Sequence, residues 1–396
     1  MKKKISVGTA LVLVLFAVLL TFQITYSFVG NEYQNKVDTM TGERSDFSLL
    51  VYADDLIRNN FYQSVDDDAL EEGLLDGYIA SLKDPYSRYL TAEAYEHYQK
   101  EQAPSGNGAG VRLTRDDKTN AVLIYSVYPS SPAEAAGLRK GDEIYRIGET
   151  LVSEMDLFDI ASALSGEVGT AVNVTVKREI AAQVLEMDFS VTRGEVKNSD
   201  VGYEMLSDSV GYIQLFAITS ETPAEFSEAL AALGSKGAGS LVIDVRNNLG
   251  ENFDAALQML DQLLPVCDLA RITDHKGKET VVKSDDKAVL LPMAVLVNSS
   301  TVSGAELFAA TLRDQAKAIL VGETTYGKGT DQAIFELDNG SAVLLSNRSF
   351  QPPVSESFEE IGVVPDHVVP FDGKKIYLVS HEEDVQLMKA LDAFAE

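Results

Sequence analysis

Cysteine is nearly absent from this sequence, since Cys267 is the only one among 396 residues. A single thiol forms no internal disulfide and builds no cysteine-rich metal site. Basic residues are also scarce: 33 Lys and Arg stand against 61 Asp and Glu, and the formal net charge is −28. A chain this acidic repels phosphate backbones, so we do not expect nucleic acid as a partner.

Motifs for metal and nucleotide binding are missing as well. The four histidines form no pair at the i, i+4 spacing and no H-E-x-x-H motif, so a metal site has no local support. Gly322–Thr330 (GETTYGKGT) nearly matches a phosphate-binding loop, but Gly329 stands where that loop needs Ser or Thr. A hairpin, not a helix, is predicted to follow it. No G-x-S-x-G motif occurs, and we expect no cofactor.

The first thirty residues contain the long apolar run of the chain. Three lysines at positions 2–4 precede Ile5–Phe22, which carries no charge, and the charge-free run continues to Gly30. A run of this length can cross a bilayer, and the lysines favour a cytoplasmic N-terminus with an exported remainder. A cleaved signal peptide is the alternative, but no small-x-small cleavage site follows Leu20. We expect a single transmembrane helix at 1–30, in the cell membrane, with the rest of the chain extracytoplasmic.

The remaining chain divides by its pattern. The hydrophobic fraction of 45% and the charged fraction of 24% are those of a globular protein, and the length predicts two or three domains. We predict a polar linker at 31–44, a helical segment at 45–102, a β-rich module at 103–195 and an alternating core at 196–396. In that core, apolar strands alternate with helices, which favours the α/β class with a mostly parallel sheet.

One predicted strand-to-helix turn carries candidate chemistry. Within Asn298–Leu307 (NSSTVSGAEL), Ser303 and Glu306 have the spacing of a capping box, and most serines in that position are structural. The same geometry suits catalysis, because free N–H groups at a helix N-terminus can hold an oxyanion. Gly304 lets a substrate approach the backbone closely. The turn by itself leaves both interpretations open.

Lys328 adds a candidate base. It lies between two glycines and beside apolar strands, where desolvation lowers the pKa of a lysine until the neutral amine can take a serine proton. Gln332 lies four residues further on and can hold the lysine nitrogen through its amide oxygen. Taken singly, Lys328 is better explained as an exposed loop residue and Gln332 as a solvated strand residue.

The combined pattern resembles the carboxyl-terminal processing (tail-specific) serine peptidases. Their motif reads roughly S-x-S-A-S-E-I and then, after one helix and one strand, F-G-K-G-T-x-Q. Here the two parts are Thr301–Leu307 (TVSGAEL) and Tyr326–Gln332 (YGKGTDQ). The resemblance implies a crotonase-like serine protease core of the α/β class. It also implies that Ser303 is the nucleophile, Lys328 the general base and Gln332 the residue that orients it.

Further motifs extend the resemblance along the chain. Leu82–Leu90 (LKDPYSRYL) is similar to L-D-P-H-S-x-Y-L, Asp244–Gly250 (DVRNNLG) to D-L-R-N-N-P-G-G, and 361–366 (IGVVPD) to G-I-x-P-D. By this resemblance, the backbone N–H groups of Gly250 and Gly304 form the oxyanion hole.

Several residues depart from the family pattern near that hole. Leu249 replaces Pro, Glu251 replaces the second Gly, and the serine motif departs at Thr301, Gly304 and Ala305. A carboxylate at position 251 opposes the charge of an oxyanion unless it points away. These departures bear on turnover rate more than on reaction type.

The β-rich module resembles a PDZ domain, with Ser131–Asp142 (SPAEAAGLRKGD) as its most specific stretch. In a PDZ domain a C-terminal peptide adds as a strand beside a helix, here predicted at 157–164. The resemblance implies that the terminal carboxylate is caught by the backbone N–H groups of one loop, formed by Gly108, Ala109, Gly110 and Val111.

Together, these features predict a membrane-anchored, extracytoplasmic serine endopeptidase. Its expected partners are proteins with apolar C-terminal tails, which the PDZ module recruits. The alternative is a catalytically silent scaffold that binds tails without cleaving them. Homo-oligomerisation and the direction in which the PDZ module affects activity stay open.

Overall fold

The structure is a computed structural model in which the chain divides into two compact units, Met1–Leu75 and Asp76–Glu396. It describes residues 47–102, 106–115, 119–155, 157–180, 183–196, 199–286, 288–289, 291–371 and 379–394.

The described part of the first unit contains helix α2 (Ser48–Asn60) and the beginning of α3 (Asp67–Ala80). No side chain of α2 is buried. The predicted transmembrane helix at 1–30 and the predicted linker at 31–44 lie outside the described residues. Among the helices that are described, none is both long enough and apolar enough to cross a bilayer.

A six-stranded sheet forms the centre of the second unit. Its order is β10-β11-β12-β15-β16-β19, and every neighbouring pair is parallel except β10 with β11. The strands are β10 (Val201–Met205), β11 (Val210–Leu215), β12 (Ser240–Asp244), β15 (Met293–Val297), β16 (Ile319–Gly322) and β19 (His367–Val368).

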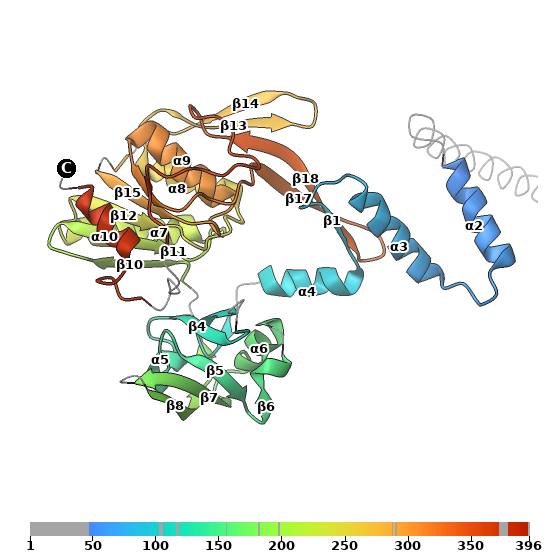
Figure 1. Ribbon diagram of the computed structural model, residues 1–396, viewed down its shortest axis with the longest axis horizontal. Coiled ribbons are helices and arrows are strands. Elements are labelled where there is room, and N and C mark those ends of the chain that lie inside the picture. Colours follow the sequence, from blue (N-terminus) through green and yellow to red (C-terminus); the bar gives the residue numbers. More distant parts are fainter. Residues whose placement is uncertain are drawn as a thin grey trace, which may run out of the picture. The chain divides into compact units, whose positions relative to one another are not determined.

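Helices pack on both faces of this sheet, because successive strand residues point to opposite sides. Ile243 packs in the cluster formed with α7, α8 and α9, whereas its neighbour Val242 packs in the cluster formed with α10. Figure 1 shows α8 and α9 side by side over the sheet. The helices are α7 (Thr222–Ser235), α8 (Phe253–Leu263), α9 (Gly304–Ala316) and α10 (Val385–Asp392).

A second, antiparallel sheet joins distant parts of the sequence. Strand β1 comes from the segment before the β-rich module, yet it pairs with β18, and Arg88 lies opposite Leu344. The following helix α4 (Ala92–Gln102) places Tyr95 against Leu90 and Ala342. The strands are β1 (Arg88–Leu90), β13 (Asp268–Asp274), β14 (Glu279–Lys283), β17 (Thr330–Glu336) and β18 (Ala342–Gln351).

The β-rich module has its own sheet and its own apolar core. Ser131 caps α5 (Pro132–Ala136) by accepting a hydrogen bond from Glu134 N, and Gly137 ends the helix with φ +89°. This is why the Pro and Gly of the predicted signature stretch stand where they do. The strands are β3 (Val111–Arg115), β4 (Val122–Val127), β5 (Glu143–Ile147), β6 (Thr150–Leu151), β7 (Ala171–Ile180) and β8 (Gln183–Thr192), with β2 (Asn107–Gly108) paired to β9 (Gly194–Glu195); a 3-10 turn (Val152–Glu154) and helix α6 (Leu157–Leu164) complete the module.

The predicted α/β core and the inserted β-rich module are confirmed. The sequence pattern does not predict β13 and β14. Polar residues interrupt both strands, and β14 buries none of its side chains fully. The sheet partner β18, which lies far away in the sequence, stabilises β13.

Candidate active site

Ser303 lies at the turn between β15 and α9. It is 6% exposed, and its φ of 53° is unusual for a residue other than glycine. Ser303 and Glu306 form the predicted capping box, in which Ser303 N donates to Glu306 Oε2 at 2.8 Å. The strained backbone is therefore held by the cap and by the buried start of the helix.

Glu306 does more than cap this helix. Its side chain is fully buried, and besides Ser303 N it accepts from Gly327 N at 2.7 Å, from Lys328 N at 2.9 Å and from the Thr325 hydroxyl. Burial raises the pKa of Glu306, and these hydrogen bonds oppose that rise. One carboxylate therefore ties the serine turn to the lysine loop. The sequence suggests only the cap.

The structure brings the three predicted catalytic side chains into one region. Lys328 Nζ donates to Gln332 Oε1 at 2.9 Å, and the Ser303 hydroxyl donates to Thr330 O at 3.5 Å. Among these described residues, the hydrogen bond of Lys328 Nζ therefore goes to Gln332 and not to Ser303. Burial lowers the pKa of Lys328, although Asp331 and other carboxylates nearby oppose the change. A lysine with a lowered pKa is suited to accept a proton.

Tyr86 also reaches this region, and the motif comparison assigns it no role. It follows Asp84 and Pro85 in the turn before β1. The Lys328 Nζ lies 4.8 Å from the centroid of the Tyr86 ring, and Gln332 Nε2 donates to Tyr86 O. The signal in the sequence is the L-K-D-P-Y-S-R-Y-L stretch, in which Tyr86 replaces the His of the family motif.

The predicted oxyanion glycines lie directly against each other. Gly250 has a φ of +60°, and a Cβ there would meet Ala305 N and Val302 O at 2.3 Å. Gly304 N donates to Gly250 O at 3.2 Å, and Gly250 N donates to Asn248 Oδ1 at 2.9 Å. Both N–H groups are thus beside the serine but occupied by acceptors of the chain itself.

A buried ion network fixes the turn that carries Gly250. Arg246 donates to both carboxylate oxygens of Asp244 at 2.9 and 2.6 Å and to both of Asp384 at 3.1 and 2.7 Å. Its Nη1 also donates to Gln386 Oε1 at 2.9 Å. Asp384 caps α10, so the C-terminal helix is bound to the turn of the predicted oxyanion hole. The sequence alone suggests only a polar turn here.

Leu249 and Glu251, which depart from the family motif in the turn at Gly250, are both exposed, Leu249 to 56%. The pKa of Glu251 is raised, first by desolvation from the protein around it and then by Asp200, while Arg112 opposes the rise. Arg112 of β3 therefore compensates the charge of Glu251, whereas Asp200, in the segment before β10, repels it.

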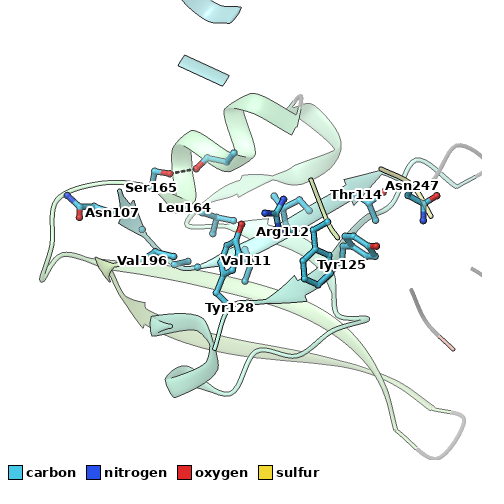
Figure 2. Close-up of a pocket in the computed structure, with 16 residues that line it drawn as sticks. Asn107, Val111, Arg112, Thr114, Tyr125, Tyr128, Leu164, Ser165, Val196 and Asn247 are labelled. Atoms are coloured by element: carbon cyan, nitrogen blue, oxygen red, sulfur yellow. Dashed lines mark hydrogen bonds between the residues drawn. The ribbon is translucent and has the colours of Figure 1, made fainter. Parts of the chain in front are cut away.

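The β-rich module contains a pocket of about 530 Å³ beside β3 and α6. Figure 2 shows Asn107 and Asn247 at opposite ends of this pocket, with Arg112 and Tyr125 between them. Arg112 donates to Asp200, and its Cζ lies 5.3 Å from the ring centroids of Tyr128 and Phe216.

The four residues of the predicted carboxylate loop all line this pocket: Gly108, Ala109, Gly110 and Val111. Ala109 N donates to Leu164 O at 3.1 Å, so one of the predicted donors already has a partner in α6. Gly110 has a φ of +83°, and a Cβ there would lie 2.5 Å from the Cβ of Ser131. Only glycine fits this position without strain.

Cys267 is a half-buried free thiol beside Ser284, far along the chain from the lysine loop. Within the described residues, no group of three or more His, Cys, Asp and Glu side chains is arranged to hold a metal ion.

Three family models match the chain. Peptidase family S41 matches residues 209–369, a PDZ domain matches 123–178, and the activating protease CtpB N-terminal domain matches 12–94. The S41 match includes the serine turn and the lysine loop.

Two curated relatives match over most of their length. The carboxy-terminal processing protease CtpA of Bacillus subtilis is 31% identical, over 89% of this chain and 75% of the relative. A carboxyl-terminal-processing protease of Synechocystis is 30% identical, over 79% of this chain and 74% of the relative.

Two solved structures have the same fold. A photosystem II D1 C-terminal processing protease is 29% identical with a TM-score of 0.51, over 78% of this chain and 84% of that one. An S41 protease from Bacteroides fragilis is 18% identical with a TM-score of 0.59, over 87% of this chain and 97% of that one. From the sequence identity and the fold together, this chain belongs to peptidase family S41 and is a serine protease of the carboxyl-terminal processing family.

Proposed function

We propose that this protease cleaves proteins that it selects through their C-terminal tails, with Ser303 as nucleophile and Lys328 as general base. The observation that carries the proposal is the placement of Ser303 Oγ 3.5 Å from Thr330 O, in the same segment in which Gln332 Oε1 holds Lys328 Nζ at 2.9 Å. The lowered pKa of Lys328 supports its role as a base. The parallel sheet covered by α7 to α10 supports a crotonase-like core.

The proposed reaction passes through an acyl-enzyme. Neutral Lys328 takes the proton of Ser303 Oγ, which attacks the carbonyl carbon of the scissile peptide. The N–H groups of Gly250 and Gly304 stabilise the oxyanion. The ammonium returns the proton to the leaving amine as the C–N bond breaks. Lys328 then takes a proton from water, the hydroxide attacks the ester carbonyl, and the ammonium gives this proton to Ser303 Oγ as the ester bond breaks.

This reaction requires three local exchanges of hydrogen bonds. Gly304 N has to leave Gly250 O, and Gly250 N has to leave Asn248 Oδ1, before both can face a substrate oxygen. Lys328 Nζ has to turn toward Ser303 Oγ. Each exchange replaces one hydrogen bond by another, so its net free energy is small compared with the binding of a peptide.

The PDZ module is proposed to recruit the tail. A peptide that adds beside β3 would fill the pocket lined by Gly108 to Val111, with its carboxylate at that loop. The same pocket includes Phe216 and Asn247, which belong to the protease core. The proposed site of action is extracytoplasmic, on the basis of the lysines and the apolar run at 1–30.

A silent tail-binding scaffold is the second candidate. The observation that favours it is the occupation of both predicted oxyanion donors by acceptors within the chain, next to Leu249 and Glu251.

The test is cleavage of an unfolded protein with an apolar C-terminus by the purified full chain, read by mass spectrometry. Ser303→Ala and Lys328→Ala are the test variants, and Ser300→Ala, an exposed serine of the same turn, is the matched control. Cleavage by the parent and the control but by neither test variant supports the peptidase. Intact tail binding without cleavage supports the scaffold, and cleavage that survives Ser303→Ala contradicts the assignment of the nucleophile.

A further inference from the structure

The turn before β1 contributes an aromatic wall to the lysine site. Tyr86 is half-buried, and its ring centroid lies 4.8 Å from Lys328 Nζ. A second ring, that of Tyr326, lies 6.5 Å from the Tyr86 ring, centroid to centroid. A cation over the face of an aromatic ring is attracted by the negative charge of the π system. The Tyr86 ring therefore stabilises the ammonium form of Lys328.

The backbone of Tyr86 orients the glutamine. A carbonyl oxygen only accepts hydrogen bonds, so the group of Gln332 that faces Tyr86 O is its Nε2. The amide oxygen Oε1 is then turned toward Lys328 Nζ, where it accepts at 2.9 Å. Tyr86 thus fixes which end of the Gln332 amide meets the lysine.

Three contacts hold Tyr86 in this place. Tyr86 N donates to Asp84 Oδ1 at 3.2 Å, and the Ser87 hydroxyl donates to the same carboxylate. Ser87 Oγ also accepts from Ser346 N of β18 at 3.0 Å. Ser346 lies opposite Gln332 in the β17–β18 pair. Burial raises the pKa of Asp84, but hydrogen bonds, first of all that from the Ser87 hydroxyl, outweigh it and lower the value, so the acceptor stays ionised.

From these contacts we infer that Tyr86 is a positioning residue of the peptidase, which holds the lysine ammonium on its ring and the Gln332 amide on its carbonyl. The inference rests on the proposed role of Lys328 as general base. Burial favours the neutral lysine that takes the serine proton, and the ring favours the ammonium that keeps it until the amine leaves.

Charged groups from several elements also act on Lys328. Asp331 of β17, Asp84 of the turn before β1 and Glu359 of the loop after β18 raise the pKa of Lys328. Arg88 of β1 lowers it. Glu306 of α9 accepts from the backbone N–H of Lys328. None of these groups changes when the ring of Tyr86 is replaced, so a change of that ring isolates its own effect.

The test is the pH dependence of kcat/KM of the full chain, because its acid limb reports the pKa of the free general base. Tyr86→Leu keeps apolar cover over Lys328 but removes the π face, so the ammonium loses stabilisation and the pKa falls. We expect the acid limb to move to lower pH by about 0.5 to 1 unit. Tyr86→Phe keeps the ring and leaves the limb in place.

Tyr89→Leu is the matched control, because Tyr89 is a buried tyrosine of β1, the strand that follows the Tyr86 turn. A second readout is chemical acylation of the Lys328 amine, measured by mass spectrometry at a series of pH values. It follows the same pKa and does not require an active enzyme. The inference is overturned if the acid limb does not move in Tyr86→Leu, or if it moves equally in Tyr86→Phe or Tyr89→Leu. If Lys328→Ala still cleaves, the proposed function itself fails; if Lys328→Ala is inactive and Tyr86→Leu is unshifted, only this inference fails.

Discussion

Gly250 and Ser303 show how the backbone of single residues shapes this site. The two turns interlock so closely that a Cβ on Gly250 would meet Ala305 N at 2.3 Å and Gly304 N at 2.5 Å. These are backbone atoms, which cannot move aside as a flexible side chain can. The position therefore requires glycine for space as well as for its φ of +60°.

Gly250→Ala should push the two turns apart and displace a donor of the oxyanion. We expect kcat/KM to fall by about a hundredfold or more. Gly277→Ala is the control, because Gly277 has a similar φ of +75° but open space around its Cα. A steady-state assay on a peptide substrate checks this result. Equal activities of the two variants would contradict the role of the close approach.

At the same scale, the sequence predicts some site residues and misses others. Ser303, Lys328 and Gln332 belong to motifs that are contiguous in the sequence. Tyr86 contacts Gln332 across 246 residues, and no periodicity or spacing connects two such segments. The buried Glu306 looks like an ordinary cap because its partners Gly327 and Lys328 come from another loop.

Among the elements, α10 has an effect beyond its own packing. Its cap residue Asp384 shares Arg246 with Asp244, and all three side chains are buried. Removing one partner of a buried ion pair leaves a charge that is only partly compensated. The helix thereby influences the turn that leads to Gly250.

Asp384→Asn should remove the charge while an asparagine still caps the helix. We expect the free energy of unfolding to fall by roughly 3 kcal/mol, with a parallel loss of cleavage. Asp392→Asn, at an exposed position of the same helix, should change stability by no more than about 0.5 kcal/mol. Chemical denaturation followed by circular dichroism gives both values, and similar values for the two variants would argue against the link.

Elements are predicted well where their apolar residues follow one another without interruption. The core strands β12 and β15 are wholly buried and read as continuous apolar runs. Strand β10 and the β13–β14 hairpin carry polar residues and gain their structure from pairing with strands elsewhere, so their short-range pattern is weak. The network around α10 is missed for the same reason, because Arg246 and Asp384 lie 138 residues apart.

For the molecule as a whole, the proposed tail selection and the proposed catalysis can be tested separately. The predicted carboxylate loop lies in the PDZ module, and Ser303 lies in the core. The module has an apolar cluster of its own, with Ile124, Ile160 and Val176 fully buried. A local change at the loop should therefore leave the core folded.

Gly110→Ala places a Cβ 2.5 Å from the Cβ of Ser131, at a φ of +83°. We expect binding of a labelled apolar C-terminal peptide to weaken about tenfold or more, since the strain costs at least 1 to 2 kcal/mol. Cleavage of a short peptide without such a tail should stay within about twofold of the parent. Fluorescence anisotropy measures the binding.

The control for this change is Gly169→Ala in the same module, where φ is +87° but no atom lies within 4 Å of the added Cβ. It keeps the backbone strain and omits the clash at the loop. If it weakens peptide binding as much as Gly110→Ala, the loop is not the carboxylate site.

The pairing of β1 with β18 also sets the order in which this enzyme can be assembled during translation. Arg88 is made early, but its partner Leu344 follows only on the order of ten to fifty seconds later at ordinary rates of synthesis. Until then Tyr86 has no strand to bring it to Lys328, and Asp384, the partner of Arg246, is made later still. The PDZ module needs no such late segment for its own apolar core. A nascent chain can therefore complete the apolar core of the PDZ module well before it completes the region around Ser303 and Lys328.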